Sequence, residues 1–265
     1  MPRTNGSGCF SFRNVLYRSH TSLYTYTKEG GFPLSTYVMS DLHGEAELFH
    51  KMLEQIRFSE TDTLYLLGDV IDRGPDGIDL LREITAAPNM ILLLGNHEYM
   101  MMQYFAPEAT ETEISRWNKN GNAPTQDAYL QLDPQAQREI LNMIAQLPTH
   151  LQITKGGKDY YLVHGFPGEN VHDEVWTRPA IDTANPMPGT ILIIGHTPVL
   201  HMQCAKEDRE DRIAEMIRNG EHPQILHAPG FINIDCGCSY DDPIKTLGCL
   251  RLDDMEEFYT HNSLR

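Results

Sequence analysis

The sequence predicts an α/β fold built around a parallel β-sheet, and two features of its apolar patterning predict it. Short apolar runs of strand length recur along the chain, and each ends at a polar cluster that contains Gly, Asp, Asn or His. The stretches between the first three runs carry apolar residues at helical spacing. This alternation of strand and helix is typical of parallel strands joined by right-handed crossovers.

Five apolar runs are expected to be strands, and the first three alternate with two helices. The expected strands are residues 37–39, 64–67, 91–94, 160–163 and 191–194. Helices are expected over 45–57 and 76–86, because the apolar residues there recur three or four positions apart and would share one face.

The middle of the chain is expected to be mostly helical over 99–150, with helices near 99–105 and 134–147. The first of these contains the run Met100–Met102. At helical spacing such residues fill a core more often than they form a peptide-docking surface, so we expect them to be buried.

Two stretches later in the chain are expected to be β structure. Residues 151–163 have the pattern of a hairpin that turns at 155–158, and 231–259 that of further strands. The stretch 172–174 is expected to be a solvated loop.

Residues 1–36 lack a sustained helical period and are interpreted as an N-terminal extension with a short strand near 22–26. A chain of 265 residues fits one large domain or two small ones. Because no repeat, low-complexity segment or linker marks a boundary, residues 37–265 are expected to form a single domain.

Charge and composition limit the partners. The chain has 21 Lys and Arg against 37 Asp and Glu, a net charge of −16, which argues against nucleic acid or an anionic membrane as a partner. No apolar run approaches the length of a membrane span, and no apolar segment follows Arg3 as in a secretory signal. The 5 cysteines form no disulfide framework. We therefore expect a cytoplasmic protein with reduced thiols.

Polar side chains follow the ends of all five expected strands. In an open α/β sheet, the loops at the C-terminal ends of strands converge on one edge, where ligands bind. The residue types delivered there are carboxylate, amide and imidazole, without thiolate, a set that suits Mn²⁺, Fe or Zn²⁺ with open coordination positions. The candidate ligands are Asp41, His43, Asp69, Asn96, His164 and His196.

Three motifs in these junctions resemble the metallophosphoesterase superfamily. They are Gly-Asp-Val-Ile-Asp-Arg-Gly over 68–74, Gly-Asn-His-Glu over 95–98, and Gly-His-Thr over 195–197. The first two resemble its phosphoprotein phosphatase branch, in the short bacterial or phage form, and the likeness runs from about residue 37 to 252. It implies a calcineurin-like fold in which two mixed β-sheets pack as a sandwich flanked by helices, in four layers.

The resemblance also implies a dinuclear metal centre. Asp41 and His43 would hold the first divalent ion, and Asp69 would bridge the two ions. The ligands of the second ion would be completed by Asn96, His164 and His196. Mn²⁺ is expected in vitro, with Fe or Zn²⁺ as the alternatives.

By the same resemblance, His97 is the general acid that protonates the leaving oxygen, and Asp72 is its carboxylate partner. Arg73, Arg178 and Asn96 would bind the substrate phosphate. A guanidinium suits this task because its planar fork grips two phosphoryl oxygens while remaining charged.

The implied reaction is hydrolysis of phosphate monoesters by direct attack of a hydroxide that bridges the metals. The implied substrates are phosphoserine and phosphothreonine on proteins, with phosphotyrosine or small phosphoesters as further options. One alternative is a symmetrical bis(5′-nucleosyl)-tetraphosphatase, a group that usually ends the second motif in Asp and lacks the carboxylate at position 72. A non-catalytic scaffold is a lower alternative, because every ligand position is filled.

A few positions depart from the family pattern. Ser40 and Cys236 stand where Gly and Thr are usual, and Asn122 ends an element that otherwise resembles Trp…Asn-Gly-Gly. The pair Cys236 and Cys238 is read as two small residues on a buried strand, with redox sensing or an extra metal site as alternatives.

Overall fold

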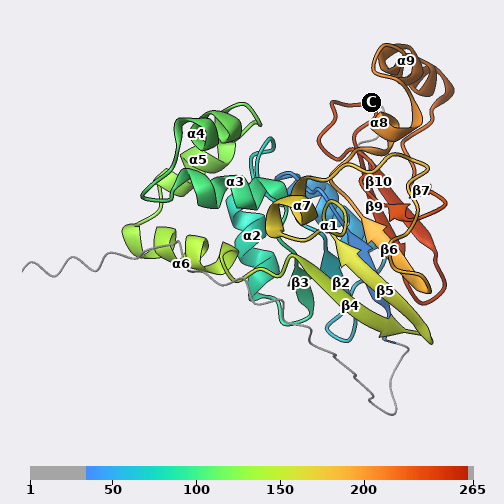
Figure 1. The fold of residues 1–265 in the computed structure, drawn as a ribbon, viewed down its shortest axis with the longest axis horizontal. Coiled ribbons are helices and arrows are strands. Elements are labelled where there is room, and N and C mark those ends of the chain that lie inside the picture. Colours follow the sequence, from blue (N-terminus) through green and yellow to red (C-terminus); the bar gives the residue numbers. More distant parts are fainter. Residues whose placement is uncertain (1–33, 262–265) are drawn as a thin grey trace, which may run out of the picture.

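The computed structural model describes residues 34–261 of the chain, and its centre is a pair of five-stranded sheets (Figure 1). The first sheet has the order β10-β9-β1-β2-β3. Its strands are β1 (Thr36–Met39), β2 (Thr63–Leu66), β3 (Met90–Leu92), β9 (Thr246–Arg251) and β10 (Glu257–His261). β1, β2 and β3 are parallel, as expected, whereas β9 and β10 run antiparallel to their neighbours.

The second sheet has the order β4-β5-β6-β8-β7. It consists of β4 (His150–Lys155), β5 (Lys158–Val163), β6 (Thr190–Ile194), β7 (Leu226–His227) and β8 (Ile232–Asn233). β5, β6 and β8 are parallel, while β4 and β7 pair antiparallel. The hairpin of β4 and β5 turns where the sequence predicts. Both sheets are mixed, which confirms the expected fold class.

Alternating side chains of β1 show how the layers meet. Val38 packs between the two sheets together with Leu162 of β5 and Ile193 of β6. Its neighbours Tyr37 and Met39 point to the opposite face, into the core beneath the helices. Since both faces are buried, β1 reads as a continuous apolar run rather than as an alternating one.

Helices α1 (Ala46–Gln55) and α2 (Gly77–Ala86) connect the parallel strands and pack on the outer face of the first sheet through their apolar stripes. Three further helices extend this layer on the same side (Figure 1). They are α4 (Glu111–Asn118), α5 (Ala123–Leu130) and α6 (Pro134–Ile144). The sequence therefore predicts the helical middle of the chain correctly.

Helix α3 (Asn96–Tyr104) begins three residues earlier than the apolar pattern indicates. Its first turn consists of the motif residues Asn96, His97 and Glu98. Because these residues are polar, the spacing of apolar residues does not indicate that the helix begins there. Met100 and Met101 are buried in the core, as expected, and Met102 is partly buried against it.

The expectation of a solvated loop at 172–174 is wrong. These residues belong to α7 (Val171–Trp176), because the side chain of Asn170 accepts a hydrogen bond from Asp173 N and caps the helix. Within it, Glu174 is buried. Helices α8 (Val199–Gln203) and α9 (Arg209–Asn219) were also not predicted.

Cys236 and Cys238 are both buried, as expected, but they lie beyond the end of β8 rather than on a strand. The strand expected near 22–26 lies outside the described residues, and β1 begins at Thr36. Within residues 34–261, no helix has the length and apolar character needed to cross a membrane.

Candidate metal centre and active site

The candidate ligands lie where strands end, at one edge of the two sheets. Backbone hydrogen bonds join their loops: Asp41 N donates to Gly68 O at 3.1 Å and His43 N to Asp69 O at 2.9 Å. Gly195 N donates to His164 O at 2.8 Å on the second sheet. All six ligand candidates are brought together, and none exposes more than 4% of its surface; they are Asp41, His43, Asp69, Asn96, His164 and His196.

The backbone at this edge is unusual. Eight residues other than glycine within 34–261 have positive φ, a conformation that L-residues rarely adopt. Six of the eight are site candidates: Asp41, His43, Asp69, Asp72, Arg73 and His196. Such strain persists only where the surroundings enforce it, and it clusters at functional sites.

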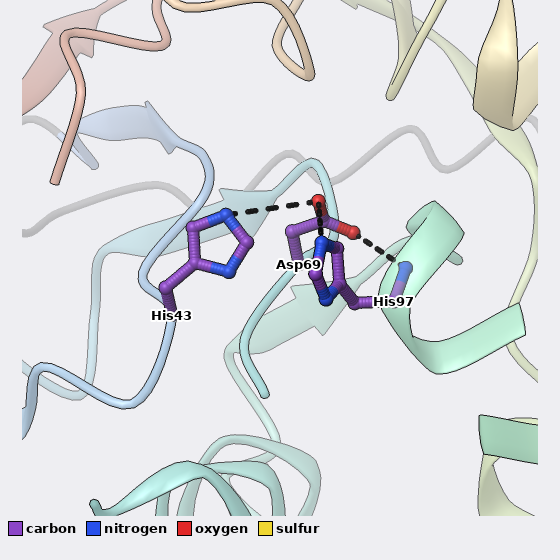
Figure 2. A group of neighbouring side chains, drawn as sticks. All are labelled: His43, Asp69 and His97. Atoms are coloured by element: carbon purple, nitrogen blue, oxygen red, sulfur yellow. Dashed lines mark hydrogen bonds and ion pairs between the residues drawn. The ribbon is translucent and has the colours of Figure 1, made fainter. Parts of the chain in front are cut away.

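Asp69 is at the centre of the arrangement (Figure 2). Its Oδ2 lies 3.8 Å from Nε2 of His43 and 3.8 Å from Nε2 of His97. The same oxygen is 3.4 Å from Nε2 of His164. Its Oδ1 accepts a hydrogen bond from the backbone N of His97 at 2.9 Å, in the first turn of α3. One carboxylate therefore faces both halves of the site, as a bridging ligand must.

In two histidines, a backbone carbonyl fixes Nδ1, the ring nitrogen on the side away from the other ligand candidates. Nδ1 of His164 donates to Leu67 O at 2.9 Å, and Nδ1 of His43 donates to Ile71 O at 3.2 Å. A carbonyl can only accept, so each Nδ1 carries a proton and each Nε2 is turned toward the site. Nε2 of His43 lies 2.9 Å from Nη1 of Arg73, which can only donate, so this nitrogen presents the lone pair that a metal-binding imidazole needs.

The remaining ligand candidates lie beside His164 or beside His43. Oδ1 of Asn96 lies 2.9 Å from Nε2 of His164, and the rings of His164 and His196 are 5.0 Å apart. Nε2 of His196 is buried without a hydrogen-bond partner. Asp41 lies on the other side, with Oδ1 3.9 Å from Nε2 of His43, and it is held by Ser40 Oγ and by His196 N.

These residues fit divalent metal ions. His43, Asp69 and His97 offer ligand atoms within 4.8 Å of one another, and so do Asp69, His164 and His196. A buried imidazole nitrogen without a partner, next to carboxylate and amide oxygens, is the donor set that borderline cations prefer. The geometry also brings His97 within ligand range, although the family resemblance makes it the acid.

The electrostatics favour cation binding at His43, His196 and Asp69, whereas the neighbouring carboxylates hold His164 protonated at neutral pH. Burial lowers the pKa of both His43 and His196 well below the ordinary value, which keeps them neutral and able to bind a cation. Burial alone would raise the pKa of Asp69, but His164, His97 and His43 hold it well below its usual range. Burial would lower the pKa of His164, yet Asp69 and then Asp41 raise it to about 9.

The candidate acid and its partner form a buried pair. Nδ1 of His97 lies 2.6 Å from Oδ2 of Asp72, and Nε1 of Trp117 donates to the same oxygen at 2.7 Å. Asp72 N in turn donates to Oγ1 of Thr125 at 2.8 Å. Asp72 is thereby fixed from α4 and α5, and it fixes the His97 ring with Nε2 toward Asp69.

The guanidinium of Arg73 lies inside the site. Its Nη atoms are 2.9 Å from Nε2 of His43 and 3.2 Å from Nε2 of His97, and Nη1 donates to Ser239 Oγ at 2.7 Å. A cation bound by His43 therefore requires this side chain to turn toward the adjoining cavity.

That cavity has a volume of about 800 Å³ and is lined by both candidate phosphate-binding arginines and by His196. Arg178 is held at its wall, where Nη1 donates to His196 O and to Thr197 Oγ1, each at 3.3 Å. The structure thus places Arg73 and Arg178 on one cavity next to the ligands.

Two supporting residues were missed by the sequence analysis. Glu98 is fully buried and accepts backbone hydrogen bonds from Asp69 N at 2.9 Å and Val70 N at 2.8 Å. It also accepts from Gly95 N at 3.2 Å, so it braces the loop that carries Asp69. The position of Glu98 in the Gly-Asn-His-Glu motif was a sequence signal that could have identified it as a supporting residue. Ser239, the partner of Arg73, has no such signal because the contact joins residues 166 positions apart.

The fold and the site together define a metallophosphoesterase. A sequence profile described as calcineurin-like phosphoesterase matches residues 34–228, well over half of the chain. The chain belongs to the calcineurin-like phosphoesterase family.

Solved structures agree on the fold. A candidate diadenosine tetraphosphatase superposes with a TM-score of 0.56 at 15% identity, over 88% of this chain and 96% of that one. A protein serine/threonine phosphatase from Saccharomyces cerevisiae gives 0.51 at 15% identity, over 88% and 81%. At such identities, the likeness concerns the fold alone.

Two similar curated proteins carry the same description. A symmetrical bis(5′-nucleosyl)-tetraphosphatase from Erwinia tasmaniensis is 40% identical over 75 residues, 28% of this chain and 27% of that protein. The one from Salmonella typhimurium is 34% identical over 99 residues, 37% and 35% of the two chains. The matched segments span only about a third of these relatives. Both relatives are named for the activity that the sequence analysis gives as its alternative.

Proposed function

We propose that the chain hydrolyses nucleoside polyphosphates, with a symmetrical dinucleoside tetraphosphate as its substrate, at a centre of two divalent metal ions. The observation that carries the proposal is the cavity of about 800 Å³ that continues from the metal-ligand cluster. Cavities of this size hold a drug-sized molecule, far more than a phosphate group. The curated relatives support the same substrate.

Six residues would hold the metals in two groups that share Asp69. Asp41 and His43 would complete one, and the other is Asn96, His164 and His196. Two such ions, when bound, would supply Lewis acidity and a nucleophile at neutral pH. Mn²⁺, Fe and Zn²⁺ all suit this donor set.

The chain's own residues would then act on the phosphoryl group. Arg73 and Arg178 would grip its non-bridging oxygens and neutralise charge that develops during reaction. His97 would deliver a proton to the departing oxygen from Nε2, while Asp72, itself positioned by Trp117, holds the ring and stabilises its charged form.

A second candidate substrate is a phosphoserine or phosphothreonine on a protein. The buried pair of His97 and Asp72 favours it, because an alkoxide leaving group must be protonated as it departs. The phosphate of a departing nucleoside diphosphate is already a stable anion and needs an acid far less. The need for His97 as a general acid thus distinguishes the two candidate substrates.

The test is turnover of diadenosine tetraphosphate and of a phosphoserine peptide by Mn²⁺-loaded protein, with products identified by chromatography. The proposal expects ADP as the only nucleotide product and a larger kcat/KM for the dinucleotide. Faster turnover of the peptide would replace it with the second candidate. Inactivity toward both, in protein with full metal content, would reject both.

A further inference from the structure

Two kinds of side chain line the cavity next to the metal ligands. The charged ones are Arg73 and Arg178, and His196 belongs to the same lining. The others relevant here form an apolar and aromatic wall, which is made of Ile181, His201, Met202 and Tyr240. A phosphate held by the arginines would leave this wall free to contact the group that the phosphate carries.

The ring of Tyr240 is held rigidly in this wall. Its backbone N donates to Gly237 O at 3.0 Å, and its ring packs so closely on Gly237, at φ +82°, that no Cβ would fit there. The ring also packs against a small cluster of Leu200, Met216 and Ile244, which joins α8 and α9 to this loop. A ring fixed before binding loses little freedom when a ligand covers it.

His201 of α8 lies beside Tyr240, with 6.1 Å between ring centroids and 54° between planes. Burial, and then the positive charges of Arg209, Arg178 and Arg73, lower the pKa of His201 to about 4. At neutral pH this side chain is an uncharged heteroaromatic ring. Arg73 and Arg178 are thus the positively charged side chains of the lining.

We propose that Tyr240, His201, Met202 and Ile181 form a subsite for the nucleobase of a nucleotide whose phosphate is held by Arg73 and Arg178. The lining offers both kinds of contact that such a ligand needs, which are cationic side chains for the phosphate and aromatic rings for the planar, uncharged base. Stacking of bases on aromatic side chains stabilises binding with little dependence on base identity. The inference rests on the proposed nucleotide substrate and assigns the residues that recognise it.

The experiment is calorimetric titration of the Mn²⁺-loaded protein with ADP and, separately, with pyrophosphate, which lacks the nucleoside. We expect ADP to bind about tenfold more tightly. In His201→Ala and in Tyr240→Leu, most of this preference should disappear, while the affinity for pyrophosphate stays within about twofold. Tyr240→Phe keeps the ring and should keep the preference.

The matched control is His172→Ala, which removes an exposed histidine of α7 that does not line the cavity. It should bind both ligands as the unaltered protein does. If Tyr240→Leu does not fold, the His201→Ala result alone decides.

Equal affinity for ADP and pyrophosphate in the unaltered protein would overturn the inference. So would a loss in His201→Ala that is the same for both ligands. Because binding is measured without turnover, failure of the proposed function has a different signature. In that case the protein would still bind ADP more tightly than pyrophosphate, but it would not cleave diadenosine tetraphosphate.

Discussion

Nδ1 of His97 and Oδ2 of Asp72 are 2.6 Å apart, and both side chains are buried. Trp117 Nε1 donates to the same oxygen, so two groups hold Oδ2, while Oδ1 of Asp72 is buried without a hydrogen-bond partner. This arrangement leaves Nε2 of His97 facing Asp69 and the metal-ligand cluster. A histidine held in this way is suited to proton transfer in that direction.

Replacing His97 with Ala should affect substrates according to their leaving groups. With an alkyl phosphate the rate should fall by about 10²–10⁴-fold, the usual contribution of general acid catalysis. With p-nitrophenyl phosphate, whose leaving group needs no proton, the fall should be under about tenfold. Steady-state kinetics on both substrates, with metal content measured in parallel, provide the check. Loss of metal in this variant would instead make His97 a ligand.

Replacing Asp69 with Asn should remove metal and activity together, because a single carboxylate oxygen faces histidines of both halves. Elemental analysis after dialysis against Mn²⁺ measures the metal. The exposed Asp79→Asn on α2 is the matched control and should retain metal. Full occupancy in the Asp69 variant would contradict the bridging assignment.

Replacing Glu98 with Gln should destabilise the loop of Asp69. The amide group cannot accept all of the backbone hydrogen bonds that the carboxylate accepts. Leaving buried N–H groups unpaired should lower the free energy of unfolding by about 1–3 kcal/mol. Metal affinity should fall by roughly 10–100-fold, as for other residues that orient ligands. Urea unfolding and Mn²⁺ titration test both effects, with Glu54→Gln on α1 as control.

Glu174 should make stability depend on pH. Burial alone would raise its pKa, but hydrogen bonds from His150, Thr149 and Tyr161 lower it below the ordinary value. A carboxyl whose folded pKa is lowered contributes stability above about pH 4.5, and this contribution is lost as the pH falls through its folded pKa. Urea unfolding should show Glu174→Gln less stable than the unaltered protein at pH 7. The gap should narrow below pH 4; a constant gap would refute the assignment.

Much of the site could be predicted because its residues follow apolar runs in short motifs. Asp41, Asp69 and Asn96 each come within four residues of a strand end, so topology alone brings them together. The contact between Arg73 and Ser239 depends on the return of β9 to the first sheet, which no local pattern shows. For the same reason the aromatic wall with Tyr240 was not foreseen.

Parts of the fold were harder to predict for a physical reason. β7 and β8 each pair over only two residues, too few to show a period. α7 depends on its cap at Asn170 more than on an apolar stripe. The apolar spacing of Ile213, Met216 and Ile217 was a usable signal for α9, and Gly220 at φ +66° ends that helix.

Anomalous X-ray scattering from crystals of the Mn²⁺-loaded protein tests the central claim most directly. The account predicts two Mn²⁺ peaks on either side of Asp69, one beside Asp41 and His43 and the other beside Asn96, His164 and His196. The guanidinium of Arg73 should then point into the cavity. A single peak, or two peaks that do not share Asp69, would contradict the account.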